Sequence, residues 1–236
     1  MARQPRNFVS GIPVHLIQRG NNRSACFFQP RDYRTYLEKL QQCSRQFDVS
    51  IHNYVLMTNH VHLLVTPESA FGISLMMHSL GTYYVHYVNR HYERTGTLWE
   101  GRYKDCLIDT DSYFLTVSRY IELNPVRAGI CQNPAQYLWS SFRRLAAGTP
   151  DNLVRPHPLY VALGATDRDR QARYAGLFQG EIPETTLRSI RDGCNKSCVL
   201  GDSQFKQRIE GQLGRALPPF QVGRPKSKSK NIEEQT

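Results

Sequence analysis

Hydrophobic and polar residues follow regular patterns through the first half of the chain. Residues 14–19 (VHLIQR) have the character of a strand and run into Gly20-Asn21-Asn22, a turn signal. In residues 30–47, apolar side chains recur at helical spacing, and Pro30 suits the start of that helix. Residues 50–57 and 60–67 then predict two strands joined by a tight Thr58-Asn59 turn.

The pattern continues with a long helix over about residues 73–93 and a strand over residues 98–108. Asp111 can cap a further helix that runs to Leu123, where Asn124-Pro125 ends it. The first six elements, in this order, predict an α+β fold with a ferredoxin-like (RRM-like) split βαβ antiparallel sheet. Such a sheet carries its two helices on one face, so the helix from Asp111 is available to cover the open face.

The second half of the chain has a different character and predicts a separate organisation. We expect one domain over residues 1–148 and a helical C-terminal extension over residues 149–220, with helical patterns in QARYAGLFQG and DSQFKQRIEGQLG. Residues 221–236 are basic and low in hydrophobic residues, which predicts a disordered tail.

Charge and composition narrow the classes of function. The net charge is +10, and both halves of the chain hold more Lys and Arg than Asp and Glu, which favours a polyanionic partner such as nucleic acid. No apolar run reaches the roughly 20 residues of a membrane span, and the first residues lack the apolar stretch of a signal peptide. We therefore expect no membrane partner and a cytoplasmic protein. The six cysteines include no CxxC pair, which argues against a structural zinc site.

The strongest chemical signal is HVHLLV at residues 60–65. Because alternate residues of a strand share a face, Val61, Leu63 and Val65 should point into the helix-covered core. His60 and His62 should then lie side by side on the other face, where both can reach one divalent ion and leave open positions for phosphate oxygens and water. The alternative is a pair of ordinary histidines on a half-exposed strand.

A second signal lies in SRYIELNPVRAG, residues 118–129. Tyr120 and Asn124 are one helical turn apart on the same stripe, beside an apolar stripe that can seat the helix on the sheet. A tyrosine hydroxyl with a pKa of about 10 is a weak nucleophile at neutral pH, but a metal ion that polarises a phosphate reduces how strong the nucleophile must be. The alternative is a core tyrosine beside an Asn-Pro that ends the helix. Glu122 lies on the other side of the helix, so we do not assign it to a metal.

Taken together, these two elements resemble a known family. A His-hydrophobic-His pair on a strand, followed by a helix with a tyrosine and a polar residue four positions later, is similar to the single-tyrosine HUH nucleases. More narrowly, YVLMTNHVHLLVTP, LWEGRYKD and RYIELNPVRAG resemble the REP-associated tyrosine transposases. The resemblance extends from about Val14 to about Phe142, which identifies residues 1–148 as a predicted HUH transposase domain.

What the resemblance implies is a metal-dependent single-strand DNA endonuclease and strand transferase. Tyr120 would be the nucleophile and would form a 5′-phosphotyrosine intermediate. His60, His62 and Asn124 would bind Mg²⁺ or Mn²⁺; other members have Gln at the position of Asn124. The DNA would be a short imperfect palindrome that folds into a REP-like hairpin. Relatives with extensions look monomeric, so we expect a monomer, with a dimer as the alternative, and an association with the nucleoid when DNA is bound.

Several basic and aromatic residues are candidates for contact with DNA, because single-strand sites combine cations for phosphates with rings for stacking. They are Arg19, Asn22 and Arg23 in or beside the RGNNR loop, Trp99, Arg102 and Lys104 in WEGRYK, and Arg127 after the predicted catalytic helix.

Two other classes of function stay open at this point. One is a hairpin DNA- or RNA-binding protein without catalysis, either RRM-like or a transposase relic, although the chain lacks the aromatic RNP pattern of an RRM. The other is a small-molecule metalloenzyme, which would leave the basic surplus unexplained; we expect no small-molecule cofactor.

Overall fold

The computed structural model describes residues 6, 8–196 and 198–216, and its centre is a sheet with the strand order β2-β3-β1-β4-β5. β1 pairs antiparallel with both β3 and β4, and β2 pairs antiparallel with β3. This arrangement confirms the predicted ferredoxin-like sheet. The strands are β1 (Val14–Arg19), β2 (Val49–Met57), β3 (His60–Pro67), β4 (Lys104–Ile108) and β5 (Val199–Leu200).

The strand predicted over residues 98–108 is wrong in its first half, because β4 begins only at Lys104. Trp99 still makes an isolated bridge to Gly20, and the backbone N–H of Glu100 donates to the carbonyl of Arg19. The next residues leave the ladder and return to β1 at the pairing of Lys104 with Ile17. The result is a loop over residues 100–103 at the end of β1.

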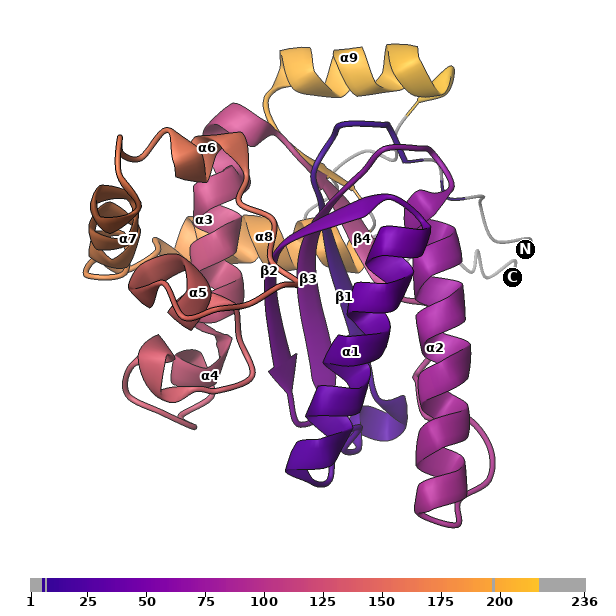
Figure 1. The fold of residues 1–236 in the computed structure, drawn as a ribbon. Helices are drawn as coiled ribbons and strands as arrows, with labels where there is room; N and C mark the ends of the chain where they lie inside the picture. Colours follow the sequence, from indigo (N-terminus) through magenta and orange to yellow (C-terminus); the bar gives the residue numbers. More distant parts are fainter. Residues whose placement is uncertain (1–5, 7, 197, 217–236) are drawn as a thin grey trace, which may run out of the picture.

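Helices cover both faces of the sheet and produce two cores. In Figure 1, α1 (Pro30–Gln46) and α2 (Gly72–His91) lie together in front of the sheet, while α8 (Glu184–Lys196) passes behind it. The alternation along β3 works as the sequence predicts. Val61, Leu63 and Val65 belong to the core under α1 and α2, whereas Leu64 belongs to the core on the other face.

The helix α3 (Thr110–Glu122) packs on that second face against β2 and β3. Asp109 stands at its N-cap, so the predicted cap Asp111 lies in the first turn instead. Phe114, Val117 and Ile121 form the apolar stripe that enters the second core.

A buried carboxylate fixes the C-terminal end of α3. Glu122 is fully buried and accepts hydrogen bonds from Asn53 of β2, Ser141 and Tyr174. Burial raises the pKa of Glu122 to about 7, and these donors act in the opposite direction. Because the donors come from β2 and from two later segments, the network ties the helix to the sheet and to the C-terminal half of the chain.

The second half of the described chain is largely helical, with α8 and β5 in addition to the two helical patterns read from the sequence. β5 extends the sheet by pairing parallel with β4. The domain limits 1–148 and 149–220 stay a prediction, and the tail 221–236 lies outside the described residues. No helix in the described ranges is long and apolar enough to cross a bilayer. The remaining helices are α4 (Asn124–Arg127), α5 (Phe142–Ala147), α6 (Pro158–Val161), α7 (Asp167–Gly176) and α9 (Ser203–Leu213), with short 3-10 turns at Asn21–Arg23 and Pro134–Gln136.

His52 of β2 joins the start of the C-terminal extension to the sheet. Its Nδ1–H donates to the carbonyl of Arg155 at 2.7 Å, and its Nε2 accepts from the Thr66 hydroxyl at 2.9 Å. The ring also meets the rings of Phe114 from α3 and His157 from the segment before α6. Burial lowers the pKa of His52 to about 4, and the Arg155 carbonyl acts in the opposite direction while His157 and the Arg155 cation lower it further. The His52 ring is therefore neutral in the folded protein at neutral pH.

We predict that His52→Gln removes part of the acid sensitivity of the fold. The pKa of His52 in the folded protein lies below its value in the unfolded chain. The stability that neutral His52 contributes above pH 6.5 is therefore lost as the pH falls toward 4. Between pH 7.5 and pH 5 the wild type should lose about 2 kcal/mol relative to the variant. Urea unfolding of both proteins across this pH range measures the difference between their free energies of unfolding. The contributions of the other titrating groups are common to both proteins and cancel in this difference. A difference that does not change with pH would contradict the assignment.

Candidate active site

The two histidines of β3 and the tyrosine of α3 meet on the face of the sheet opposite α1 and α2. The ring centroids of His60 and His62 lie 5.0 Å apart, and those of His62 and Tyr120 lie 5.9 Å apart, edge to face. His62 and Tyr120 are buried, and His60 is half-buried. His62 and Tyr120 are 58 positions apart in the sequence. They are neighbours because the apolar stripe of α3 packs into the core on this face of the sheet.

A neighbour in the turn fixes the tautomer of His60. The Nδ1–H of His60 donates to Oδ1 of Asn59 at 2.7 Å. The orientation of the Asn59 amide is itself set, because its Nδ2 donates to the carbonyl of Arg23 at 2.9 Å. The lone pair of His60 is therefore on Nε2, which is the arrangement found in histidines whose Nδ1–H is held while the other nitrogen binds a metal.

His62 stands at the end of a buried chain of hydrogen bonds. Its Nδ1 lies 2.9 Å from Nε2 of His15 on β1, and Nδ1 of His15 lies 3.0 Å from Sγ of Cys194 on α8. Protons can be arranged along this chain in two directions. When His62 donates to His15 and His15 donates to Cys194, the lone pair of His62 is on Nε2, as in His60.

Burial keeps these imidazoles neutral. It lowers the pKa of His60 to about 4 and that of His15 to about 3, with Arg19 and Arg127 respectively adding to the effect. The pKa of His62 is lowered well below its usual value by burial and by the neighbouring His15 and His60. Only neutral imidazole binds a metal, so the pair is ready to act as ligands at neutral pH.

Two cations flank Tyr120. The guanidinium of Arg127 lies 4.3 Å from the ring centroid and donates to the Tyr120 carbonyl at 2.7 Å. Burial raises the pKa of the phenol, whereas Arg127 and a hydrogen bond from Arg191 of α8 lower it. The phenol is therefore protonated at neutral pH, and both guanidiniums are placed to stabilise the phenolate as it forms.

Asn124 lies where the sequence predicts, one turn beyond Tyr120. Its Nδ2 donates to the carbonyls of Tyr120 at 3.0 Å and Ile121 at 3.1 Å, which caps the end of α3. Oδ1 is then the atom that could face a cation. In the described ranges, no group of three or more His, Cys, Asp or Glu side chains could hold a metal. A metal at this site would accordingly need an amide, phosphate or water oxygen beside the imidazoles.

The residues predicted to contact DNA separate into two groups. Arg19, Arg102 and Lys104 line one cleft of about 410 Å³ together with Arg6, beside the end of β1. Asn22 and Arg23 are exposed in the short 3-10 turn after β1, next to Asn59, and Arg127 lies on Tyr120 itself. Trp99 differs from the expectation of an accessible stacking ring, because only 6% of it is exposed and it packs on Tyr84.

Three residues at this site were missed by the sequence analysis: His15, Arg191 and Cys194. The strand predicted over residues 14–19 includes His15 without giving it a role, and Cys194 is one of the six cysteines that include no CxxC pair. Alternation along β1 tells which residues share a face with His15, but only the register between β1 and β3 places His15 beside His62. Arg191 and Cys194 lie on α8, a helix that carries no motif in the sequence.

Comparisons with known proteins identify a family for the first half of the chain. The family model described as "Transposase IS200 like" matches residues 8–124. The chain belongs, over these residues, to the IS200-like transposase family. The matched span includes β1, both histidines of β3 and α3 with Tyr120, while Arg127, Arg191 and Cys194 lie beyond it.

One solved structure shares the fold, and a second match is weaker. A REP-associated tyrosine transposase bound to a REP hairpin superimposes with a TM-score of 0.54 and 19% identity, covering 66% of this chain and 93% of that one. A putative transposase from Deinococcus radiodurans has a TM-score of 0.35 and 19% identity, covering 51% of this chain and 96% of that one. No curated protein matches the chain.

We predict that thiol labelling will report the position of α8. Cys131 is half-exposed, whereas the other five cysteines, including Cys194, are buried. Ellman's reagent should modify one thiol at least about tenfold faster than the rest, because a buried thiol is inert until the structure opens. Cys131→Ser should remove the fast phase. A fast phase that instead disappears in Cys194→Ser would show that α8 does not stay on the sheet.

Proposed function

We propose that this transposase is a metal-dependent single-strand DNA endonuclease and strand transferase of the HUH type, with Tyr120 as its nucleophile. One observation carries the proposal. The Tyr120 ring lies beside two neutral imidazoles, and hydrogen bonds to both Nδ1 atoms allow both Nε2 atoms to act as ligands. The two alternatives, a core tyrosine and a pair of ordinary strand histidines, do not explain why the three rings lie together.

His60 and His62 would hold the metal ion, with Oδ1 of Asn124 as a third ligand. A bound Mg²⁺ or Mn²⁺ would supply charge that polarises the scissile phosphate. The donor set fits such an ion incompletely, since imidazoles and one amide leave open positions. Open positions are what a phosphate substrate requires, so the small number of protein ligands favours a catalytic site over a structural one.

The protein groups account for the transfer itself. The Tyr120 hydroxyl attacks phosphorus and gives up its proton, the bond from phosphorus to the 3′ oxygen breaks, and the DNA leaves with a 3′-hydroxyl. The 5′ phosphate stays on Tyr120, and Arg127 and Arg191 stabilise the negative charge that develops on the phenol oxygen. Because the tyrosine ester keeps the phosphodiester energy, attack by another 3′-hydroxyl rejoins the strand without ATP.

We propose single-stranded DNA that folds into a hairpin as the substrate. The REP-associated transposase that shares the fold was solved with a REP hairpin, and the cleft beside β1 is lined by arginine and lysine. We propose a monomer, in which α8 of the same chain completes the site through Arg191 and Cys194.

We predict that Tyr120→Phe abolishes both cleavage and the covalent protein–DNA adduct on a single-stranded hairpin with Mn²⁺. The matched control is Tyr113→Phe, which removes a hydroxyl seven residues earlier on the same helix and should cleave normally. Denaturing gels separate nicked DNA from the adduct. If Tyr120→Phe cuts as well as the wild type, Tyr120 is not the nucleophile. If the wild type and Tyr113→Phe both bind the hairpin but neither cuts it, the protein is a hairpin-binding relic without catalysis.

We predict that Asn59→Ala weakens Mn²⁺ binding by about 10- to 100-fold, because it releases the Nδ1–H of His60 and with it the tautomer. Asn59→Asp keeps the acceptor and should bind at least as tightly as the wild type. Electron paramagnetic resonance measures free Mn²⁺ without DNA. Equal affinities of the Ala and Asp variants would show that His60 does not depend on this hydrogen bond.

A further inference from the structure

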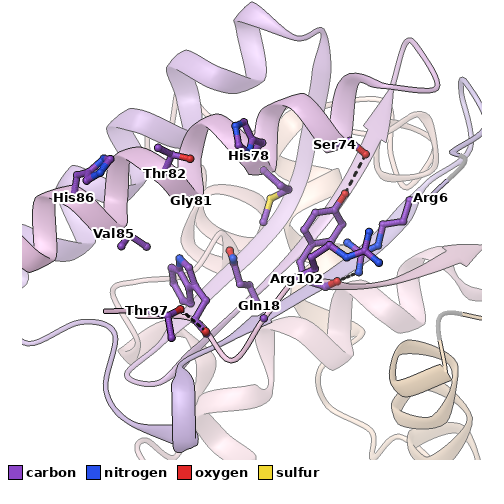
Figure 2. Close-up of a pocket in the computed structure, with 14 residues that line it drawn as sticks. Arg6, Gln18, Ser74, His78, Gly81, Thr82, Val85, His86, Thr97 and Arg102 are labelled. Carbon is purple, nitrogen blue, oxygen red and sulfur yellow. Dashed lines mark hydrogen bonds between the residues drawn. The ribbon is translucent and has the colours of Figure 1, made fainter. Parts of the chain in front are cut away.

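A cavity of about 600 Å³ lies on the α2 side of the sheet, away from the tyrosine. Figure 2 shows it between α2, the end of β1 and the loop that precedes β4. Its walls are mixed. Met77 and Val85 of α2 are apolar, Trp99 and Tyr103 present rings, and Gln18 of β1 presents an amide. Its size lies in the range that holds small organic ligands.

Besides Nη1 of Arg6, two buried polar atoms at this cavity have no hydrogen-bond partner in the part of the chain that the structure describes. They are Oε1 of Gln18 and Nε1 of Trp99, on residues that are 7% and 6% exposed. An unpaired acceptor and an unpaired donor are costly when buried, so such atoms require an explanation. In Figure 2 the Gln18 side chain extends toward Gly81 of α2, among the residues that line the cavity, so its amide faces the cavity.

Gly81 enlarges the cavity at this point. It lies inside α2, where glycine is less favourable than alanine by about 1 kcal/mol. No close backbone packing requires it, because a Cβ added there would meet only Nε2 of Gln18, at 3.9 Å. A larger side chain at residue 81 would project toward Gln18 and fill the space.

The cavity is continuous with the basic cleft that leads to the candidate active site. Arg6, Gly101, Arg102 and Tyr103 line both. The cleft also includes Arg19, which pairs with His60 across the β1–β3 ladder. A chain of cations therefore extends from the metal-ligand histidines, around the loop over residues 100–103, to the mouth of the cavity.

We propose that this cavity binds one base of the single-stranded DNA, with the adjoining phosphates in the basic cleft. The inference rests on the proposed function and adds to it a site for a base on the opposite face of the sheet from Tyr120. A base is planar and carries donors and acceptors on its edge. Gln18 and Trp99 offer it an acceptor and a donor, while the apolar side chains contact its faces.

The test compares DNA with and without bases, in the absence of metal so that nothing is cut. The probes are dA12, dC12 and dT12, and a dodecamer of abasic tetrahydrofuran units with the same phosphates. At least one base-bearing strand should bind the wild type about tenfold more tightly than the abasic strand, as one stacked and hydrogen-bonded base would give. Fluorescence anisotropy measures the affinities.

Gly81→Leu should remove most of this preference for bases and leave the affinity for the abasic strand unchanged, because the cleft is untouched. Gly81→Ala is the matched control and should keep the preference. Gln18→Leu, which has a similar volume without polar atoms, should reduce the differences among the three base-bearing strands. Thermal melting confirms that each variant folds.

The proposal is overturned if the abasic strand binds the wild type as tightly as the others, or if Gly81→Leu keeps the full preference for bases. The four free nucleoside monophosphates form a further arm. If they bind at micromolar concentration and the dodecamers show no preference, the cavity takes a free nucleotide instead of a strand, which also overturns it. Cleavage by Tyr120 plays no part in these measurements, so the two proposals can fail separately.

Discussion

The pairing of β1 with β3 is the interaction on which the site depends. Its register sets Arg19 opposite His60 and Ile17 opposite His62, which places His15 within hydrogen-bond distance of His62. A slip of one residue would turn both β3 histidines into the core under α1 and α2. The apolar side chains on that face, Leu16, Leu63 and Val65 among them, therefore hold the register and with it the chemistry on the opposite face.

The C-terminal half of the chain belongs to the same physical unit as the site. Arg191 reaches the tyrosine, Cys194 ends the hydrogen-bond chain through His15, and Tyr174 donates to the buried carboxylate that fixes α3. These contacts lie beyond residue 124, where the match to the transposase family ends. The family region supplies the histidines and the tyrosine, and the later helices supply cations and packing around them.

Much of the fold followed from the sequence because periodicity reports burial directly. Strict alternation in residues 60–65 gave the two faces of β3, and the spacing of Phe114, Val117 and Ile121 gave the seating of α3. The limits of prediction from periodicity also have physical causes. The strand predicted from residue 98 failed because Leu98, Trp99 and Tyr103 favour a strand, whereas Glu100, Gly101 and Arg102 between them form a loop that leaves the ladder. His15, Arg191 and Cys194 were missed because their roles come from neighbours that are distant in sequence, and no local pattern encodes them.

Mass spectrometry of the protein–DNA adduct tests the central claim most directly. After cleavage of a hairpin strand with Mn²⁺, digestion with nuclease and trypsin should leave a nucleotide on the peptide over residues 120–127, which contains Tyr120 as its single tyrosine. We expect a mass increase on this peptide from a nucleotide attached through its 5′ phosphate. An adduct on any other peptide, or cleavage with no adduct at all, would contradict it.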